Sequence, residues 1–353
     1  MLKTSDGALC DAYDVAMLDL DGVVYIGQQA VAGAPEHLDR ARAAGMQLAY
    51  VTNNASRPPT AVAEHLRDLG LDVDDADVVT SAQAAARVLA DRLPPGAAVF
   101  VIGGEGLEVA LGEQGLRPVQ ERSEQPLAVV SGFSADLRWS RVITGAILVR
   151  EGLPWVASNT DLTVPTPDGP GPGNGALVEV VARFAERDPV VAGKPEPPLF
   201  QETLRRVGGE RPLVVGDRID TDIEGARNTG YDSLLVMTGV TDLAQLVAVP
   251  EPLRPSYVAA DLGALARAQP APTLDGDEVR AGGWRASVRD GRLVVEQADE
   301  DEDEDAAGDG SVDAWWRAVA AAGWRHLDAH GSAVDVSRLR PPSTVGARPA
   351  RST

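Results

Sequence analysis

The interpretation of this chain depends on one stretch, Val15-Ala16-Met17-Leu18-Asp19-Leu20-Asp21-Gly22. Its four apolar residues predict a buried strand, and two carboxylates follow where that strand gives way to a loop. Charge beside a dry sheet needs a partner, and the usual partner is a metal ion or a reacting group. Because Asp and Gly are common in this chain, the tetrad alone is a weak signal. The rest of the sequence has to supply what Asp19 and Asp21 would need.

The composition limits the class of protein. A chain of 353 residues, 44% of them hydrophobic, is long enough for about two or three domains with buried cores. Its single cysteine, Cys10, excludes an internal disulfide framework. No apolar run approaches a membrane span, and residues 1–14 contain neither the basic nor the apolar region of a signal peptide. We therefore expect a cytoplasmic protein without a membrane span, and the sequence leaves open whether it forms a homo-oligomer.

The net charge bears on the partners. A formal charge of −21 argues against nucleic acid or an anionic membrane, since both bind basic patches. It would also repel an anionic substrate, so any anion site must be built from local positive charge. Only two of the 32 basic side chains are lysines, Lys3 and Lys194. Two explanations are open for Lys194, which lies between Gly193 and Pro195. Either a tight site there needs a compact point charge, or this lysine merely escaped a codon bias.

The order of predicted strands and helices indicates an inserted domain. Strands and helices alternate along residues 1–84 and again along 187–265, which predicts a doubly wound parallel α/β sheet. Val190–Ala192 is assigned to this sheet as a strand. Residues 85–186 repeat the pattern on a smaller scale, with a loop predicted from Pro165 to Gly175. We interpret this middle part as an α/β cap inserted into the core.

The character of the sequence changes after a Pro/Ala-rich linker near residues 269–273. The remainder, 273–353, predicts a small α+β extension with a hairpin that turns at Asp290-Gly291 and a helix over residues 312–322. The acidic run 299–305 is interpreted as a solvated loop, with docking of a basic partner as the alternative. Because no glycine-rich pyrophosphate loop opens a helix here, we expect no second activity.

Polar side chains stand at four predicted strand ends, and parallel sheets form their sites beyond the carboxyl ends of their strands. The four sets are Asp19 with Asp21, Thr52 with Asn53, Lys194, and Asp217 with Asp222. Carboxylates suit Mg²⁺, which binds through few protein ligands plus water and substrate phosphate. Hydroxyl, amide and ammonium donors suit phosphate oxygens, and a carboxylate such as that of Asp19 can form an aspartyl-phosphate. The set therefore predicts a phosphoryl-transfer site.

These strand ends resemble the four ordered motifs of the haloacid dehalogenase superfamily. The motifs are Asp19-Leu20-Asp21-Gly22-Val23, Thr52-Asn53-Asn54, Gly193-Lys194-Pro195, and Gly216-Asp217-Arg218 through Thr221-Asp222. Further segments resemble the branch with NagD-like, nitrophenyl-phosphatase and phosphoglycolate phosphatases, namely Ser158-Asn159-Thr160-Asp161, Pro172-Gly173-Asn174-Gly175, and Lys194-Pro195-Glu196-Pro197. In that branch a larger α/β cap lies between the second and third motifs, as residues 85–186 do here. The resemblance covers residues 12 to about 262.

The resemblance implies a role for each acidic motif residue. Asp19 would be the nucleophile and a ligand of Mg²⁺. Asp21 would be the general acid and then the base, while its backbone carbonyl touches the metal. Asp217 would be the third protein ligand, and Asp222 would order a metal-bound water. The acid role needs a protonated Asp21 near neutral pH, and a cap that excludes water would raise its pKa.

The remaining motif residues would handle the phosphate. By resemblance, Thr52, Asn53 and Lys194 would bind the transferring phosphoryl group, where positive charge offsets the charge of the transition state. Asn159 and Asp161 would lie on a cap loop that faces the site, with a purely structural turn as the alternative.

The resemblance implies a Mg²⁺-dependent phosphatase that acts on a small phosphorylated metabolite. The cap, the arginine-rich composition and the C-terminal extension resemble actinobacterial glycerol 3-phosphate phosphatases. The choice of that ester over phosphoglycolate, a sugar phosphate, nitrophenyl phosphate or pyridoxal phosphate rests on this resemblance alone. A dehalogenase would lack Asp21, and a phosphomutase would carry a small helical cap. The alternative of another class is a non-enzymatic regulator that acts through the extension.

Overall fold

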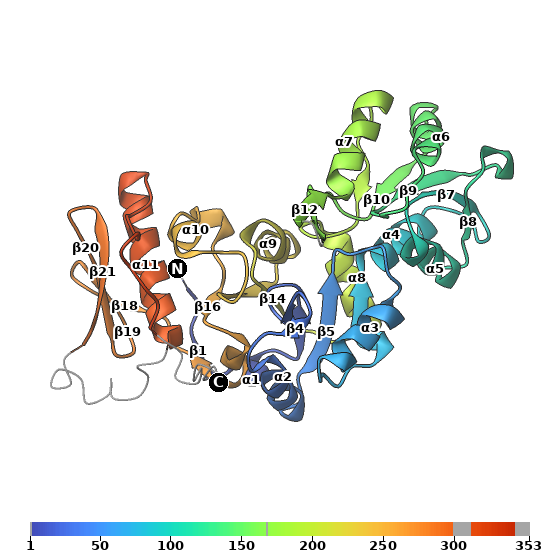
Figure 1. Cartoon of the computed structure of the whole chain (residues 1–353). Coiled ribbons are helices and arrows are strands. Elements are labelled where there is room, and N and C mark those ends of the chain that lie inside the picture. The colour runs from blue at the N-terminus through green and yellow to red at the C-terminus, as the bar shows by residue number, and fades with distance from the viewer. Residues whose placement is uncertain (1, 167–168, 299–311, 343–353) are drawn as a thin grey trace, which may run out of the picture.

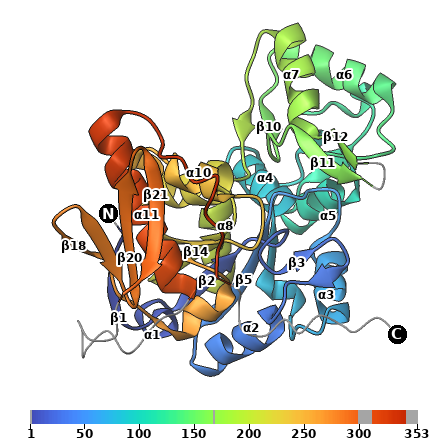
Figure 2. The same ribbon diagram turned by 60° about the vertical axis from the view of Figure 1, so that its left-hand side comes forward.

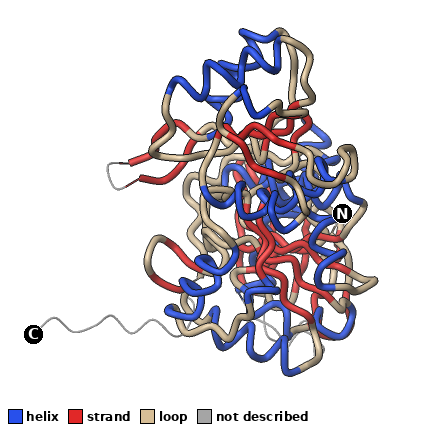
Figure 3. The backbone as a smooth tube through the Cα atoms, turned by 90° about the vertical axis from the view of Figure 1, so that its right-hand side faces the viewer, coloured by secondary structure: helices blue, strands red, loops and turns tan. Residues whose placement is uncertain are grey.

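Three packed parts make up the molecule (Figure 1). The computed structural model describes residues 2–166, 169–298 and 312–342. A core with a six-stranded sheet lies in the middle, with a five-stranded α/β unit on one side and a small α+β unit on the other. In Figure 3 the strands of the core form a central layer with helices around it. The predicted α/β class with a parallel core sheet is confirmed.

The core sheet has the strand order β16-β15-β14-β2-β5-β6, and all of its pairs are parallel. Its strands are β2 (Val15–Leu18), β5 (Gln47–Thr52), β6 (Val78–Thr80), β14 (Pro212–Gly216), β15 (Asp232–Val236) and β16 (Tyr257–Ala259). Leu18 lies beside Val215 of β14 and Tyr50 of β5. The carboxyl ends of the three central strands are therefore level, and the loops that follow them meet.

Helices cover both faces of this sheet. They are α1 (Leu9–Ala12), α2 (Ala34–Ala43), α3 (Pro59–Asp68), α8 (Pro197–Val207), α9 (Glu224–Thr229) and α10 (Leu243–Val247). Successive side chains of β2 go to opposite faces, as the period of a strand requires. Ala16 and Leu18 pack in one hydrophobic cluster with α2 and α3, while Val15 and Met17 pack in another with α8.

The second sheet has the order β13-β10-β9-β7-β8 and is also parallel throughout. Its strands are β7 (Ala98–Ile102), β8 (Arg117–Val119), β9 (Ala128–Ser131), β10 (Trp155–Ala157) and β13 (Val190–Val191). Helices α6 (Trp139–Arg150) and α7 (Asn174–Ala185) cover one face, and α4 (Ser81–Ala90) and α5 (Glu105–Glu113) cover the other. We call this unit the cap.

Two sequence-based assignments in the cap are wrong. The strand predicted for Val190–Ala192 in the core, within residues 187–265, pairs with β10 of the cap sheet instead. A run of two or three apolar residues does not specify which of two neighbouring sheets it joins. The loop predicted from Pro165 to Gly175 contains an antiparallel hairpin, β11 (Thr163–Thr166) with β12 (Gly169–Pro172), and α7 begins at Asn174. Its Pro/Gly content hid the backbone pairing.

Helix α4 lies between the two sheets and joins them. A capping box of Thr80 with Gln83 starts this helix. Its small buried side chains belong to one hydrophobic cluster that also contains Val51 of the core sheet and Val101 of the cap sheet. Alanine brings two layers close together without leaving voids. Cap and core therefore share a continuous hydrophobic interior.

The C-terminal extension is an antiparallel sheet with one long helix, α11 (Val312–His330). The strands are β18 (Thr273–Asp275), β19 (Glu278–Ala281), β20 (Trp284–Arg289) and β21 (Arg292–Gln297). The predicted hairpin at Asp290-Gly291 is present. The predicted helix over 312–322 is too short, because α11 continues to His330. The acidic run 299–305 lies outside the described residues.

Helix α11 lies between its own sheet and the edge strand β16 of the core, as Figures 1 and 2 show. Two small sheets complete the structure, β1 (Ser5–Ala8) with β17 (Ala268–Gln269), and β3 (Tyr25–Ile26) with β4 (Gln29–Ala30). The second of these directly follows the Asp19-Leu20-Asp21-Gly22 tetrad. Within the described ranges, no helix is long and apolar enough to cross a membrane.

Candidate active site

Four of the predicted site residues meet in one buried cluster at the carboxyl ends of the core strands. Asp19 follows β2, Asp217 follows β14, and Asp222 lies on a single π-helical turn, η3 (Ile219–Ile223). The Nζ atom of Lys194 lies 2.5 Å from Oδ1 of Asp19 and 2.8 Å from Oδ1 of Asp222. Lys194 is 4% exposed and Asp222 is fully buried, so water screens these ion pairs little.

The charges of this cluster depend on one another. Burial alone would lower the pKa of Lys194, but the carboxylates of Asp19 and Asp222 outweigh burial and raise that pKa above its ordinary value. The ammonium group therefore stays charged. Burial raises the pKa of Asp222, and the Lys194 charge opposes that rise. The positive charge of Lys194 thus offsets the repulsion between the negatively charged carboxylates at the strand ends.

The carboxylates of Asp19, Asp217 and Asp222 are suited to a hard cation. Each can present one oxygen so that all three oxygens lie within 4.8 Å of one another. Oδ1 of Asp217 is buried and has no hydrogen-bond partner among the described residues. A buried carboxylate oxygen without a donor fits a metal ion, and Mg²⁺ prefers oxygen ligands. Burial, followed by the charge of Asp19, raises the pKa of Asp217 to about 6.

Two glycines leave room for the Asp217 carboxylate. A Cβ atom at Gly22 would lie 2.5 Å from Oδ2 of Asp217, and one at Gly239 would lie 2.0 Å from the same atom. Gly22 has φ of +87°, so its conformation also favours glycine. The same Oδ2 accepts the N–H of Val240 at 2.6 Å. The backbone of the loop after β15 therefore holds this carboxylate directly, a contact that residue types alone do not reveal.

The side chain of Asp21 is not part of the three-carboxylate group. Its backbone forms a bridge with Tyr25 at the start of the β3–β4 hairpin. Asp21 is an exposed residue, but partial burial of its carboxyl group, followed by the charge of Asp19, raises the pKa of Asp21. The direction of this shift is the one that a general acid near neutral pH needs. The contact of the Asp21 backbone carbonyl with a metal ion stays a prediction.

Thr52 and Asn53 lie where β5 ends, beside Lys194. The Oγ1 atom of Thr52 accepts the N–H of Asn54 at 3.1 Å, which leaves its hydroxyl proton for another acceptor. The side chain of Asn53 accepts the N–H of Lys194 at 2.7 Å and donates to the Lys194 carbonyl at 3.0 Å. Here Asn53 positions the lysine; a direct phosphate contact by Asn53 stays a prediction.

A cap residue also reaches the site. The Nδ2 atom of Asn53 lies 3.2 Å from both carboxylate oxygens of Asp161, and the Asn53 carbonyl accepts Nδ2 of Asn159 at 2.7 Å. Burial raises the pKa of Asp161. From the sequence this segment is predicted either as a loop that faces the site or as a structural turn. Its contact with Asn53 connects the cap to the strand end that carries Thr52.

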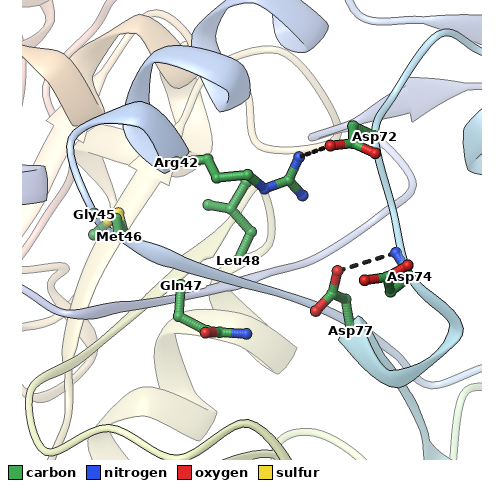
Figure 4. Close-up of a pocket in the computed structure, with 8 residues that line it drawn as sticks. All are labelled: Arg42, Gly45, Met46, Gln47, Leu48, Asp72, Asp74 and Asp77. Carbon is green, nitrogen blue, oxygen red and sulfur yellow. Dashed lines mark hydrogen bonds and ion pairs between the residues drawn. The ribbon is translucent and has the colours of Figure 1, made fainter.

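Two hollows formed by described residues lie away from this cluster. One lies at the amino end of β5, where the polar groups satisfy one another: Arg42 is 3.4 Å from Asp72, and Asp77 accepts the N–H of Asp74 (Figure 4). The six residues of β5 separate it from the strand end by about 20 Å. The other, about 440 Å³, is in the cap and is lined mainly by apolar side chains between the β11–β12 hairpin and α7. Neither contains the carboxylate cluster.

Comparison with known proteins places this geometry in a family context. A model described as haloacid dehalogenase-like hydrolase matches residues 16–117, and a HAD-hydrolase-like model matches residues 191–265. The chain is 40% identical over 325 residues to a D-glycerol 3-phosphate phosphatase of Mycobacterium tuberculosis, covering 92% of this chain and 90% of that protein. It is 36% identical over 252 residues to an acid sugar phosphatase of Staphylococcus aureus, covering 71% and 95%.

Solved structures show the same likeness. A glycerol phosphate phosphatase from Mycobacterium tuberculosis in complex with magnesium has a TM-score of 0.78 and 39% identity, covering 90% of this chain and 92% of that chain. A 4-nitrophenylphosphatase from Thermotoga maritima has a TM-score of 0.67 and 30% identity, covering 73% and 98%.

The raised pKa of Asp217 predicts how metal removal changes stability. Because its folded-state pKa of about 6 lies above the ordinary 3.8, protonation favours the folded state; this contribution is present at low pH and lost as the pH rises through about 6. Metal-free protein should therefore have a lower melting temperature at about pH 7 than at pH 5. Addition of Mg²⁺ should raise the melting temperature more at pH 7 than at pH 5. Thermal unfolding in EDTA and in Mg²⁺ at both pH values measures this.

The matched control for this prediction is Asp217→Asn, which keeps the shape and removes the charge. It should reduce both the pH dependence and the response to Mg²⁺. A variant with the same pH dependence and Mg²⁺ response as the wild type would contradict the prediction.

Proposed function

Because this chain belongs to the haloacid dehalogenase-like hydrolases, we propose that its core strand ends form the active site of a magnesium-dependent phosphatase for glycerol 3-phosphate. Together with this family, the relatives named as phosphatases and the related structure with magnesium make the chain a metal-dependent phosphoric monoester hydrolase. The residues that act and the ester that they cleave are the proposal. The observation that carries it is the placement of the Lys194 ammonium between Asp19 and Asp222, next to the unpartnered oxygen of Asp217.

In the proposed first step, a carboxylate oxygen of Asp19 attacks phosphorus. The bond from phosphorus to the ester oxygen breaks, and Asp21 gives its proton to the leaving oxygen, which departs as an alcohol. Asp19 is then an aspartyl-phosphate, and Asp21 is a carboxylate. In the second step Asp21 takes a proton from a water that attacks phosphorus, which releases inorganic phosphate and regenerates Asp19.

The surrounding residues hold the reacting groups. Asp19, Asp217 and the backbone carbonyl of Asp21 would hold Mg²⁺, with Asp222 beside them. When bound, Mg²⁺ supplies positive charge close to the phosphoryl oxygens. Lys194 would supply further positive charge, and the Thr52 hydroxyl could donate to a phosphoryl oxygen. This local positive charge answers the repulsion that the net charge of −21 would exert on an anionic ester.

Glycerol 3-phosphate is supported as the substrate by the relative of that name. The alignment of 325 residues with it reaches into the C-terminal extension, whereas the acid sugar phosphatases align over 252 residues. A sugar phosphate is therefore the second candidate. A cytoplasmic location and assembly into a homo-oligomer stay predictions.

A comparison of esters tests the substrate. With Mg²⁺ present, kcat/KM for glycerol 3-phosphate should exceed that for glucose 6-phosphate, phosphoglycolate, nitrophenyl phosphate and pyridoxal phosphate by at least about ten-fold, which is the scale that a few substrate contacts can supply. A higher kcat/KM for glucose 6-phosphate would favour the second candidate.

Replacement of the proposed nucleophile tests the mechanism. Asp19→Asn should lower kcat by at least about 1,000-fold, because the amide cannot form the phosphoryl bond. Asp220→Asn is the matched control, since Asp220 is exposed and pairs with Arg218. It should retain most of the activity. Appreciable Mg²⁺-dependent turnover by Asp19→Asn would refute the nucleophile assignment.

The two lysines of the chain allow a clean test of charge shape. Lys194→Arg should lower kcat/KM by about 100-fold, because a planar guanidinium does not fit the narrow space between the carboxylates of Asp19 and Asp222. Lys3→Arg, at an ion pair with Asp232 on the surface, should behave as the wild type. If Lys194→Arg and Lys3→Arg had similar kinetics, codon bias would be the better explanation for the lysine at position 194.

A further inference from the structure

The C-terminal extension is connected to the Asp217 carboxylate through a short series of contacts. The first contact is within the site, where the N–H of Val240 donates to Oδ2 of Asp217 at 2.6 Å. Thr241 holds the same segment, because its hydroxyl donates to the Asp217 carbonyl at 2.6 Å. The side chain of Val240 is 61% exposed, so side-chain packing does not fix this loop at that residue. Its position is set by the anchors on either side.

On the far side the loop passes into α10. Asp242 caps this helix, since its carboxylate accepts the N–H of Gln245 at 2.8 Å. A five-residue helix has little stability of its own and takes its position from tertiary contacts. Leu246 and Val247 of α10 are fully buried. They lie in the hydrophobic cluster that contains the tryptophans of α11.

Helix α11 contacts α10 at two adjacent residues. The indole N–H of Trp324 donates to the carbonyl of Leu246 at 2.8 Å, in a buried position. A Cβ atom at Gly323 would lie 2.6 Å from the Val247 side chain, so the two helices approach closely. Arg254 stacks on the Trp324 ring at 5.2 Å and pairs with Asp328, which fixes the end of α11.

A second connection runs to the other motif carboxylate. Ile223, which directly follows Asp222, and Leu235 of β15 belong to the same hydrophobic cluster as Trp315 and Trp324. The turn η3 that carries Asp222 and the loop that binds Asp217 thus both rest on the interior that α11 completes. Two carboxylates of the site have their support in the extension.

We propose that α11 is a structural support of the metal site, in which Gly323 and Trp324 are positioning residues that hold α10 and, through it, the Val240 N–H against Asp217. This inference rests on the proposed function, because it takes Asp217 as a ligand of the divalent cation. It assigns to α11 (Val312–His330) a role in cation affinity that packing alone does not imply.

Two variants test the contact. Gly323→Ala places a methyl group against Val247, and Trp324→Phe removes the N–H donor while it keeps the aromatic ring. Both should weaken binding of Mn²⁺, a spectroscopic probe for the Mg²⁺ site, by about three- to ten-fold, somewhat less than loss of a direct partner of a ligand. Electron paramagnetic resonance counts free Mn²⁺ and needs no turnover. At saturating Mg²⁺, KM for the ester should change little.

The control variant is Val279→Ala, in β19. Val279 is 1% exposed and packs in the same cluster from β19, a strand of the extension's own sheet. It should lower the melting temperature about as much as Gly323→Ala without changing Mn²⁺ affinity. Unchanged affinity in Gly323→Ala and Trp324→Phe, or an equal loss in Val279→Ala, would overturn the inference.

Asp217→Asn separates this inference from the proposed function. If Asp217→Asn loses Mn²⁺ and the α11 variants do not, the metal site stands and its support by α11 is wrong. If Asp217→Asn binds Mn²⁺ like the wild type, the metal assignment itself fails, and the inference fails with it.

Discussion

The ammonium group of Lys194, buried between Asp19 and Asp222, is the interaction on which the rest of the site depends. Two like charges about 4 Å apart repel by about 4 kcal/mol at an effective dielectric constant of 20. Three ionised carboxylates close together would therefore cost about as much as a domain's whole stability. Asp19, Asp217 and Asp222 carry three negative charges when ionised, and Lys194 returns one. The two negative charges that remain match the charge of a divalent cation. A bound cation would therefore remove the repulsion between this acidic site and an anionic phosphate ester.

Position explains why lysine and not arginine fills this place in an arginine-rich chain. Arg218 directly follows Asp217, yet its guanidinium pairs with both oxygens of Asp220, at 3.0 and 2.8 Å, on the exposed side of the loop. A planar guanidinium group suits a single carboxylate, with which it can form two parallel hydrogen bonds. Asp19 and Asp222 come from different elements and meet the lysine from separate directions. A compact ammonium with several donors satisfies both.

The sequence predicted the side chains of the site and missed the backbone that supports them. Asp19, Lys194 and Asp217 could be foreseen because polar residues at the ends of parallel strands meet at one edge. The Val240 N–H could not, because a backbone donor leaves no mark in residue type. The hairpin β11–β12 was missed for the same reason, since Pro and Gly in Thr163–Pro172 read as a loop although their backbones pair. Asp161 was visible as a motif residue, but its contact with Asn53 depends on how the cap sits on the core.

The position of the cap follows from packing that the site itself does not contain. One hydrophobic cluster runs from β5 of the core through α4 into β7 of the cap. Sliding the cap would expose part of that cluster, at about 25 cal/mol for each Å² of apolar surface. The hydrophobic cluster shared by β5, α4 and β7 therefore fixes the position of Asp161 relative to Asn53. On the opposite side, α11 covers the edge strand β16, and Asp313 accepts the N–H of Ala260 there. The strand-end loops therefore lie between two buried supports, the cap packing on one side and α11 on the other, and their local contacts only have to orient individual side chains.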